Sequence, residues 1–246
     1  MTDRNLALPA DDDASEFAVH IGSSLLELVP GVGPTVARAL DYKLARRKAA
    51  RERQFQIYVV AAIKELWEER DSRPPIEDLF DSDMFVAAFE RCSRAAAETA
   101  SETKRARLAR AAASAVFAGS LRESETETFI ELAARYSDLH VWLLSFYCDP
   151  AGWLEANGME SAASPGIRGG KRDEPVQAAL KLGPRNMAIV QAAIEDLQRD
   201  MMLAVFDLDE SVGDRKQFAP QTRRRARRFL RFLREADTTA PAPSLR

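Results

Sequence analysis

Apolar residues recur at three- and four-residue steps along most of the chain, a spacing that predicts amphipathic helices. A short apolar helix is expected over residues 17–28, and a long second helix is expected to start near residue 35, after a turn rich in glycine and proline. The distal part of the second helix carries one stripe that we expect to be buried: Phe55, Val59, Ala62, Ile63 and Leu66. Pro74 and Pro75 should end this helix, because proline cannot donate a backbone hydrogen bond.

Four further stripes predict core helices in the middle of the chain. Their members are Phe85, Ala88, Phe89, Cys92 and Ala96; Leu108, Ala112, Ala115 and Val116; Phe129, Ile130, Ala133 and Tyr136; and Leu139, Trp142, Leu143 and Phe146. We expect Gly119 to form a left-handed cap, residues 124–127 to form a capping box, and Ser137 to cap the next helix. That last helix should end at Asp149 and Pro150.

The C-terminal third mixes loops with shorter elements. Residues 157–173 are rich in glycine, serine, alanine and proline, and we expect a loop there. A short helix should start at Glu174 and Pro175 and end at Gly183, and a longer one should carry Met187, Val190, Ile194 and Leu197. Residues 202–208 are expected to form a strand that pairs with residues 217–220 after a turn at 211–214, before Thr222 caps a final arginine-rich helix.

The fold class expected from this order is mainly α. We predict a multi-helix bundle, followed by a small C-terminal unit with at most a short two-stranded β-hairpin. The order of elements over residues 139–233 resembles a degenerate winged helix. The expected organisation is a flexible acidic arm at residues 1–16, a helical bundle domain at 17–136, a winged-helix-like domain at 137–236 with its loop at 157–173, and a disordered tail at 237–246.

Composition supports a folded protein, and charge is segregated along it. Hydrophobic residues make up 46% of the 246 residues and charged residues 30%, which argues against wholesale disorder. The net charge of −3 excludes a strongly basic protein, but two basic stretches stand out against an acidic start. The basic stretches are Arg38, Lys43, Arg46, Arg47, Lys48, Arg51 and Arg53, and Arg223, Arg224, Arg225, Arg227, Arg228, Arg231 and Arg234.

The residues that usually carry chemistry are sparse. Cys92 and Cys148 have no partner at a metal-ligand spacing, so neither a disulfide framework nor a metal site is expected. The two histidines belong to no readable pairing of nucleophile and base, and no glycine-rich nucleotide loop is present. We therefore predict a protein without enzymatic activity, cofactor or small-molecule substrate. The sequence shows neither a secretion signal nor a membrane span, which predicts a cytoplasmic location.

Residues 25–40 resemble a helix-hairpin-helix motif, a nucleic-acid-binding element. Gly31, Val32 and Gly33 match the tight hairpin of that family, in which glycines let backbone amides approach a phosphate. The resemblance implies phosphate contacts at the start of the following helix, at Thr35, and from nearby basic side chains. Those side chains are Arg38, Lys43, Arg46 and Arg47. The alternative is a plain glycine- and proline-rich turn between two helices, followed by a solvated basic face.

The arginine-rich closing helix is the second candidate for nucleic-acid binding. Its candidate phosphate ligands are Arg223, Arg224, Arg227 and Arg228. The alternative, which we favour, is that Phe229, Phe232 and Leu233 dock this helix while its arginines stay in water or pair with acidic helices. In a winged helix, residues 186–199 would enter the DNA groove, but the acidic side chains there oppose phosphate and favour protein contact instead.

A broader resemblance covers about two thirds of the chain. It rests on residues 29–33, on the stretch 97–105, and on residues 139–144 before Asp149 and Pro150. These segments resemble a family of uncharacterised bacterial helical proteins, some of whose relatives resemble abortive-infection and phage-defence proteins. The resemblance implies a bacterial cytoplasmic accessory role and no particular activity.

Three classes of function follow from these observations. The leading one is a non-enzymatic accessory protein that acts through contact with another protein or through self-assembly, in phage defence or regulation. The alternative is a DNA-binding protein that uses the hairpin and the basic helices. The third is a membrane-associating effector, because residues 17–40 are apolar and are followed by basic residues that suit an anionic lipid surface.

Overall fold

The computed structural model describes residues 34–70, 75, 80–117, 123–159, 170–182, 187–213 and 217–233, with side chains from residue 40 onward. Several predicted features lie outside these residues: the arm at 1–16, the apolar helix at 17–28, the cap at Gly119 and the tail at 237–246. The chain divides into two units, Met1–Gln54 and Phe55–Arg246, which are described separately below. The predicted division at residue 136 stays a prediction.

The described part of the first unit is helical. Helix α2 (Pro34–Glu68) begins there and continues into the second unit, so the prediction of a long second helix is confirmed. No side chain between residues 40 and 54 is buried, and Leu40, Tyr42 and Leu44 are exposed. Lys48 and Glu52 form an ion pair of 4.0 Å one turn apart, an arrangement that supports an exposed helix.

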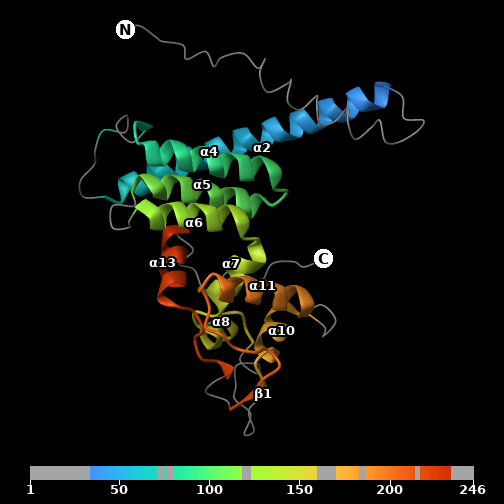
Figure 1. The fold of residues 1–246 in the computed structure, drawn as a ribbon, viewed down its shortest axis with the longest axis vertical. Helices are drawn as coiled ribbons and strands as arrows, with labels where there is room; N and C mark the ends of the chain where they lie inside the picture. The colour runs from blue at the N-terminus through green and yellow to red at the C-terminus, as the bar shows by residue number, and fades with distance from the viewer. Residues whose placement is uncertain are drawn as a thin grey trace. The chain divides into compact units, whose positions relative to one another are not determined.

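The second unit is also mainly helical, as the sequence predicts (Figure 1). Its elements after α2 are α4 (Asp83–Glu98), α5 (Glu102–Val116), α6 (Glu123–Arg135), α7 (Asp138–Phe146), α8 (Pro150–Ala156), β1 (Gly170–Lys171), α10 (Glu174–Leu180), α11 (Met187–Arg199), β2 (Ser211–Val212) and α13 (Arg224–Leu233). The strands β1 and β2 form the two-stranded antiparallel sheet of the described residues, so the expected fold class is confirmed.

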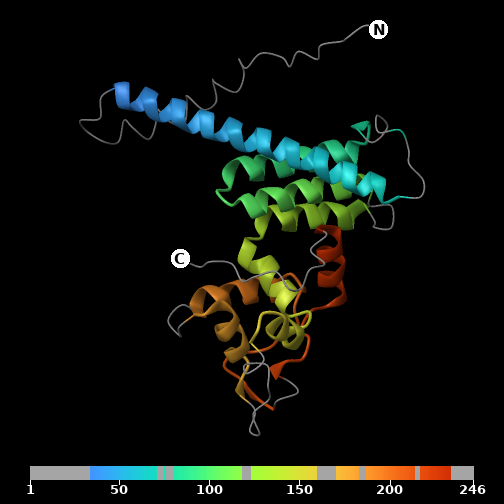
Figure 2. The same ribbon diagram turned by 180° about the vertical axis from the view of Figure 1, so that it is seen from behind.

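Helices α4, α5 and α6 pack side by side (Figures 1 and 2). The middle helix, α5, buries a run of small residues: Ala109, Ala111, Ala112, Ala113, Ser114 and Ala115. Short side chains let neighbouring helices approach closely, because little volume separates the two backbones. The stripe predicted on α2 is buried from Phe55 to Leu66, and the Phe55 ring lies 5.4 Å from that of Phe89.

The final helix closes the core against earlier helices. Helix α13 contacts α5, α6 and α7. The rings of Phe229 and Phe232 lie 5.4 and 5.6 Å from that of Phe129, and Phe229 also meets Tyr136 edge to face. All four aromatic side chains are buried, as is Leu233. The prediction that apolar residues dock this helix is therefore confirmed.

The predicted strand pair is wrong in its position. Residues 202–208 form only an isolated bridge, in which Leu203 pairs with Thr222, and the observed strands instead pair Gly170 with Val212 and Lys171 with Ser211. The backbone pairing ends with the amide of Ala204, which donates to the carbonyl of Gln221, and a local turn follows in which the Asp207 carboxylate accepts from the amide of Asp209. The strand at 170–171, inside the predicted loop, was missed because glycine and lysine have low strand propensity.

Helix boundaries agree with the predictions in part. The cap at Ser137 is confirmed, and the His140 side chain completes a capping box with it. The box at residues 124–127 is wrong, because α6 begins at Glu123 and Ser124 lies in its first turn. The cap at Thr222 is also wrong: this residue pairs with Leu203 through the backbone, and its buried hydroxyl has no hydrogen-bond partner in the part of the chain that the structure describes.

Two short helices differ from the prediction at their ends. Helix α8 starts where a helix was expected to stop, because Asp149 accepts from the Gly152 amide and Pro150 suits the first turn. Helix α10 starts at Glu174 as expected and ends at Leu180, before Gly183. Lys181 adopts a left-handed conformation with φ of 53° and donates its amide to Ala178, which ends the helix early.

We predict that Phe229→Ala lowers the free energy of unfolding by about 3–5 kcal/mol, the usual cost of removing a buried phenyl ring. The ring fills the space between Phe129 and Tyr136, so its removal leaves a cavity that α13 cannot close. Denaturant unfolding followed by circular dichroism measures the change. Val205→Ala is the control: this side chain is 80% exposed, and its truncation should cost less than about 0.5 kcal/mol.

Candidate functional site

The first set of predicted site residues lies in the first unit. Gly31, Val32 and Gly33 fall outside the described residues, and Thr35 and Arg38 lie in α2 with side chains that are likewise not described. The remaining basic side chains form what we call the basic segment of α2, residues 43–53. It contains the exposed residues Lys43, Arg46, Arg47, Lys48 and Arg53, together with the half-buried Arg51.

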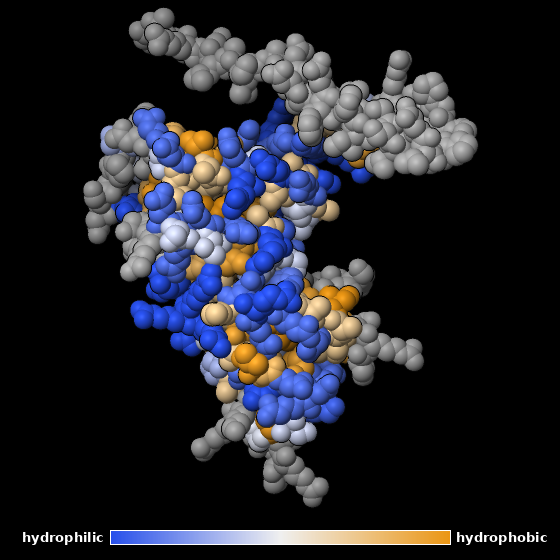
Figure 3. Space-filling model, viewed as in Figure 1, coloured by the Kyte–Doolittle hydropathy of each residue, from blue (hydrophilic) through white to orange (hydrophobic). Residues whose placement is uncertain are grey.

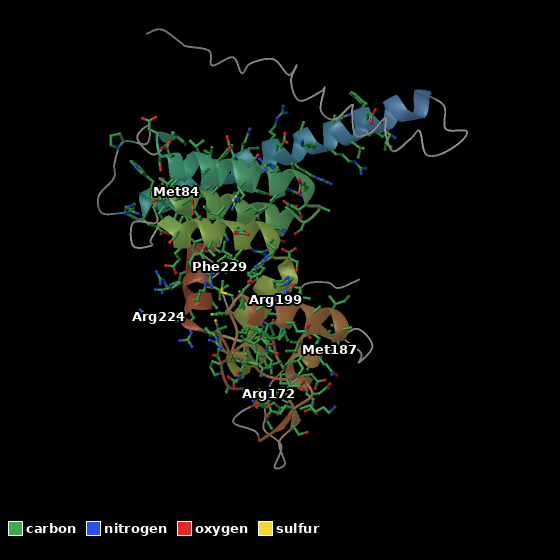
Figure 4. The ribbon with its side chains drawn as sticks, in the orientation of Figure 1. Met84, Arg172, Met187, Arg199, Arg224 and Phe229 are labelled. Atoms are coloured by element: carbon green, nitrogen blue, oxygen red, sulfur yellow. The ribbon has the colours of Figure 1, made fainter. Side chains whose placement is uncertain are left out.

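The second set of predicted residues lies on α13 in the second unit. Arg223, Arg224 and Arg227 are exposed, and Figure 4 shows Arg224 at the start of α13. Arg228 pairs with Glu125 of α6 at 2.6 Å, as the favoured alternative predicts. The guanidinium of Arg223 donates to the carbonyl of Leu203 at 3.0 Å. These two arginines therefore already take part in holding α13 to its neighbours.

A groove between α4 and α6, which we call the charged groove, is the feature that sequence analysis missed. Its volume is about 510 Å³. It is lined by Met84, Ala87, Ala88, Glu90, Arg91 and Arg94 of α4 and by Glu127, Thr128, Ile130 and Glu131 of α6. On the face drawn in Figure 3, apolar patches lie among hydrophilic side chains over the helices of the bundle.

The charges of this groove differ between its walls: α4 contributes two arginines and Glu90, and α6 contributes two glutamates. Arg91 and Arg94 stand on α4, and Glu127 and Glu131 stand on α6; all four are exposed. None of them forms an ion pair with another side chain in the described part of the chain. The sequence indicates each wall separately, because the arginines are three residues apart and the glutamates four, and residues at these spacings lie on the same face of a helix. Only the packing of α4 against α6 brings the two walls together.

A polar cluster joins the end of α6 to α7 and α11. The Tyr136 hydroxyl donates to Asp200 at 2.6 Å, and Arg135 binds the same carboxylate. The ring of His140 stacks on that of Tyr136 with centroids 5.1 Å apart. Burial and the hydrogen bond to Asp200 raise the pKa of Tyr136, so this phenol stays protonated.

Within this cluster a chain of polar contacts runs from Ser137 through His140 to Asp196. The Ser137 hydroxyl is 2.7 Å from Nδ1 of His140, and Nε2 of His140 is 3.5 Å from the Asp196 carboxylate. Sequence analysis finds no pairing of nucleophile and base, so this alignment is a product of folding. The capping box of α7 accounts for its serine and histidine, and Asp196 also pairs with Arg199 of its own helix at 2.6 Å.

The segment predicted to enter a DNA groove presents little positive charge. Helix α11 exposes Ala188, Ile189 and Glu195, and its Arg199 is held by Asp196. Asn186 and the preceding Arg185 lie outside the described residues. Arg199 is the one basic residue of α11 as described, and the preference for protein contact at this surface stays a prediction.

Comparisons with known proteins gave no match, whether with protein-family models, with curated proteins or with solved structures. The suggested relationships to bacterial defence proteins, to the winged helix and to the helix-hairpin-helix motif therefore stay predictions. Within the described residues, no helix combines the length and the apolar character needed to cross a membrane.

We predict that His140 titrates below its ordinary pKa of 6.5, because burial disfavours its charged form more than Asp196 stabilises it. The unfolded chain then binds a proton more readily than the folded one. The stability contributed by neutral His140 is complete above about pH 6.5 and is lost as the pH falls towards the lowered pKa.

The measurement is a series of denaturant unfolding curves between pH 4.5 and pH 8 (roughly two units either side of the ordinary histidine pKa). His140→Gln is the matched variant, because glutamine at this position can keep the capping box but does not titrate. The stability of wild type relative to the variant should fall with acidification. A histidine resonance that is absent from this variant and titrates above 6.5 would contradict the prediction.

Proposed function

We propose that the protein is a non-enzymatic interaction protein that self-associates through the charged groove between α4 and α6. The observation that carries the proposal is the opposition of Arg91 and Arg94 on one wall to Glu127 and Glu131 on the other, all exposed. The partner is a second copy of this chain. An accessory role in phage defence or regulation rests on the sequence resemblance alone.

Symmetry supports a second copy as the partner. In a two-fold dimer the same patch of both copies forms the contact. If one residue of the first copy meets a second residue of the other copy, the reverse contact forms as well. When the two-fold axis runs along the groove, the α4 wall of one copy meets the α6 wall of the other, and arginines face glutamates at both ends of the contact. The charged side chains of the α4 wall, Glu90, Arg91 and Arg94, carry a net positive charge, and those of the α6 wall are both glutamates, so this arrangement places opposite net charges face to face.

The apolar lining supports burial of this surface. Met84 and Ala87 lie among the charges of the groove, and removing their apolar area from water stabilises a complex. Charges at the edge of such a contact contribute mainly to specificity and to the rate of association. The dimer should therefore weaken as salt concentration rises.

We predict that light scattering shows a dimer of the wild-type protein at low ionic strength, and that the dimeric fraction increases with protein concentration. Arg91→Glu and Glu131→Arg should each weaken the dimer by roughly tenfold or more, which corresponds to about 1.4 kcal/mol. Each substitution places like charges opposite one another at both ends of a symmetric contact.

The decisive sample is a mixture of the two variants. In the mixed dimer the new carboxylate of the Arg91→Glu copy faces the new guanidinium of the Glu131→Arg copy. The opposite end keeps the original pair, so association should recover. Arg110→Glu is the control, because Arg110 is exposed on α5 and does not line the groove. A monomer at every concentration, or variants that do not recover on mixing, would rule out this dimer.

Nucleic-acid binding by the basic segment of α2 is the second candidate function. The observation that favours it is an exposed helix that carries six basic residues between positions 43 and 53, of which Lys48 pairs with Glu52. Clustered basic side chains release condensed counterions when they bind phosphates, and this release drives association.

We predict that a labelled 20-base-pair duplex, about two helical turns, binds the protein at low salt, as followed by fluorescence anisotropy. Replacing Arg46 and Arg47 together by alanine should weaken binding to all sequences alike. The slope of log affinity against log salt should become shallower by about 0.9 for each phosphate that the variant no longer neutralises. Arg110→Ala is the matched control on α5, and absence of binding even at low salt would count against this function.

A further inference from the structure

A second cavity lies where α10 and α11 meet strand β1 and residues 207–209. We call it the acidic cavity; its volume is about 620 Å³. It is lined by Lys171, Asp173, Glu174, Gln177, Met187, Ala188, Gln191, Asp207, Leu208 and Asp209. Figure 4 marks Met187 at the start of α11, on one side of this cavity. Its size falls within the range of roughly 300–1,000 Å³ that is common for small-molecule sites.

Negative charge dominates the lining. Four carboxylates face one ammonium group, and that ammonium, Lys171, already lies 3.6 Å from Asp209. Glu174 accepts from the amide of Gln217 at 3.0 Å, which holds the carboxylate without neutralising it. The lining therefore keeps an excess of negative charge that a positively charged group would balance.

Asp173 is the most unusual member of this lining. Asp173 is only 9% exposed; one carboxylate oxygen accepts from Gln177, and the other, Oδ1, has no hydrogen-bond partner among the described residues. Although Asp173 precedes α10, its side chain does not cap that helix. Burying a carboxylate oxygen without a hydrogen-bond donor costs free energy. A ligand that donates to this oxygen would remove that cost, and the described side chains supply no such donor.

A second buried polar atom lies within electrostatic reach of Asp173. The Tyr147 hydroxyl has no hydrogen-bond partner among the described residues, and its side chain is buried. Burial raises the pKa of Tyr147, the positive charge of Arg172 lowers it, and the Asp173 carboxylate raises it. Asp173 and Tyr147 thus each keep a buried polar atom without a partner in the described part of the chain.

The spacing of the carboxylates favours an organic cation over a metal ion. Among the described residues, no three histidine, cysteine or acidic side chains are placed to hold one metal ion. The carboxylates instead line a wider space together with Met187, Ala188 and Leu208. An ammonium or guanidinium group on an aliphatic stem matches both parts, because its head donates several hydrogen bonds and its stem packs on apolar surface.

We propose that the acidic cavity binds an organic cation whose ammonium or guanidinium group donates to Asp173, with its aliphatic part against Met187, Ala188 and Leu208. The cation is either a free polyamine or the side chain of a lysine or arginine in a peptide. This site is separate from the charged groove, since the two share no lining residue.

The test is titration calorimetry of the full chain at low ionic strength with two probes, spermidine and the tripeptide Gly-Arg-Gly. Binding of spermidine alone identifies a free amine as the ligand, and binding of the tripeptide alone identifies a side chain. Asp173→Asn should lower the affinity for the probe that binds by about tenfold or more, because the substitution removes the buried charge. Ala188→Phe should also abolish binding by filling the cavity, and it changes an exposed position outside the core of α11.

The control is Glu155→Gln, which removes an exposed carboxylate of α8 that does not line the cavity. It should leave the affinity unchanged. Failure of both probes to bind the wild-type protein overturns the proposal. So does binding that Ala188→Phe leaves intact, or that Glu155→Gln weakens as much as Asp173→Asn does, since either result would show a general attraction of cations to an acidic surface.

Discussion

Close packing around α5 is the constraint on which the bundle depends. Ala109, Ala111, Ala112 and Ala113 are fully buried, so the backbones of α4 and α6 can approach a helix that occupies little volume. Interiors at this density leave little room for larger side chains. Helices α4 and α6, which line the charged groove, both pack against α5 and also contact each other. The two walls of the candidate interaction surface therefore belong to helices that share this alanine-rich neighbour.

An ion pair between a buried arginine and a half-buried aspartate ties the bundle to the elements that follow it. Arg107 of α5 is 4% exposed and lies 2.9 Å from Asp138 at the start of α7, and the Ser101 hydroxyl donates to the same carboxylate at 2.5 Å. Such a pair is costly to break, because removing one partner leaves an uncompensated buried charge. Together with the aromatic contacts of α13, it joins α5, α6 and α7 into one packed body.

The charged residues of the second unit divide into two groups with different roles. Arg228 with Glu125, and Arg135 with Asp200, hold helices together through direct pairs. The arginines and glutamates of the charged groove form no such pairs within the described residues, and Asp173 keeps a carboxylate oxygen without a donor. Charge that folding leaves unsatisfied beside apolar surface is the physical basis of both binding proposals.

Local chemistry made much of the fold predictable. The buried stripe from Phe55 to Leu66, the cap at Ser137 and the docking of α13 through Phe229 all follow from spacing and from side-chain type. Strand positions did not follow, because β1 and β2 pair residues about forty positions apart and depend on where the intervening helices bring the backbone. The two cavities lay beyond prediction for the same reason. A sequence shows that Arg91 and Glu131, or Asp173 and Asp207, are charged, but only the packing of helices decides that they share a surface.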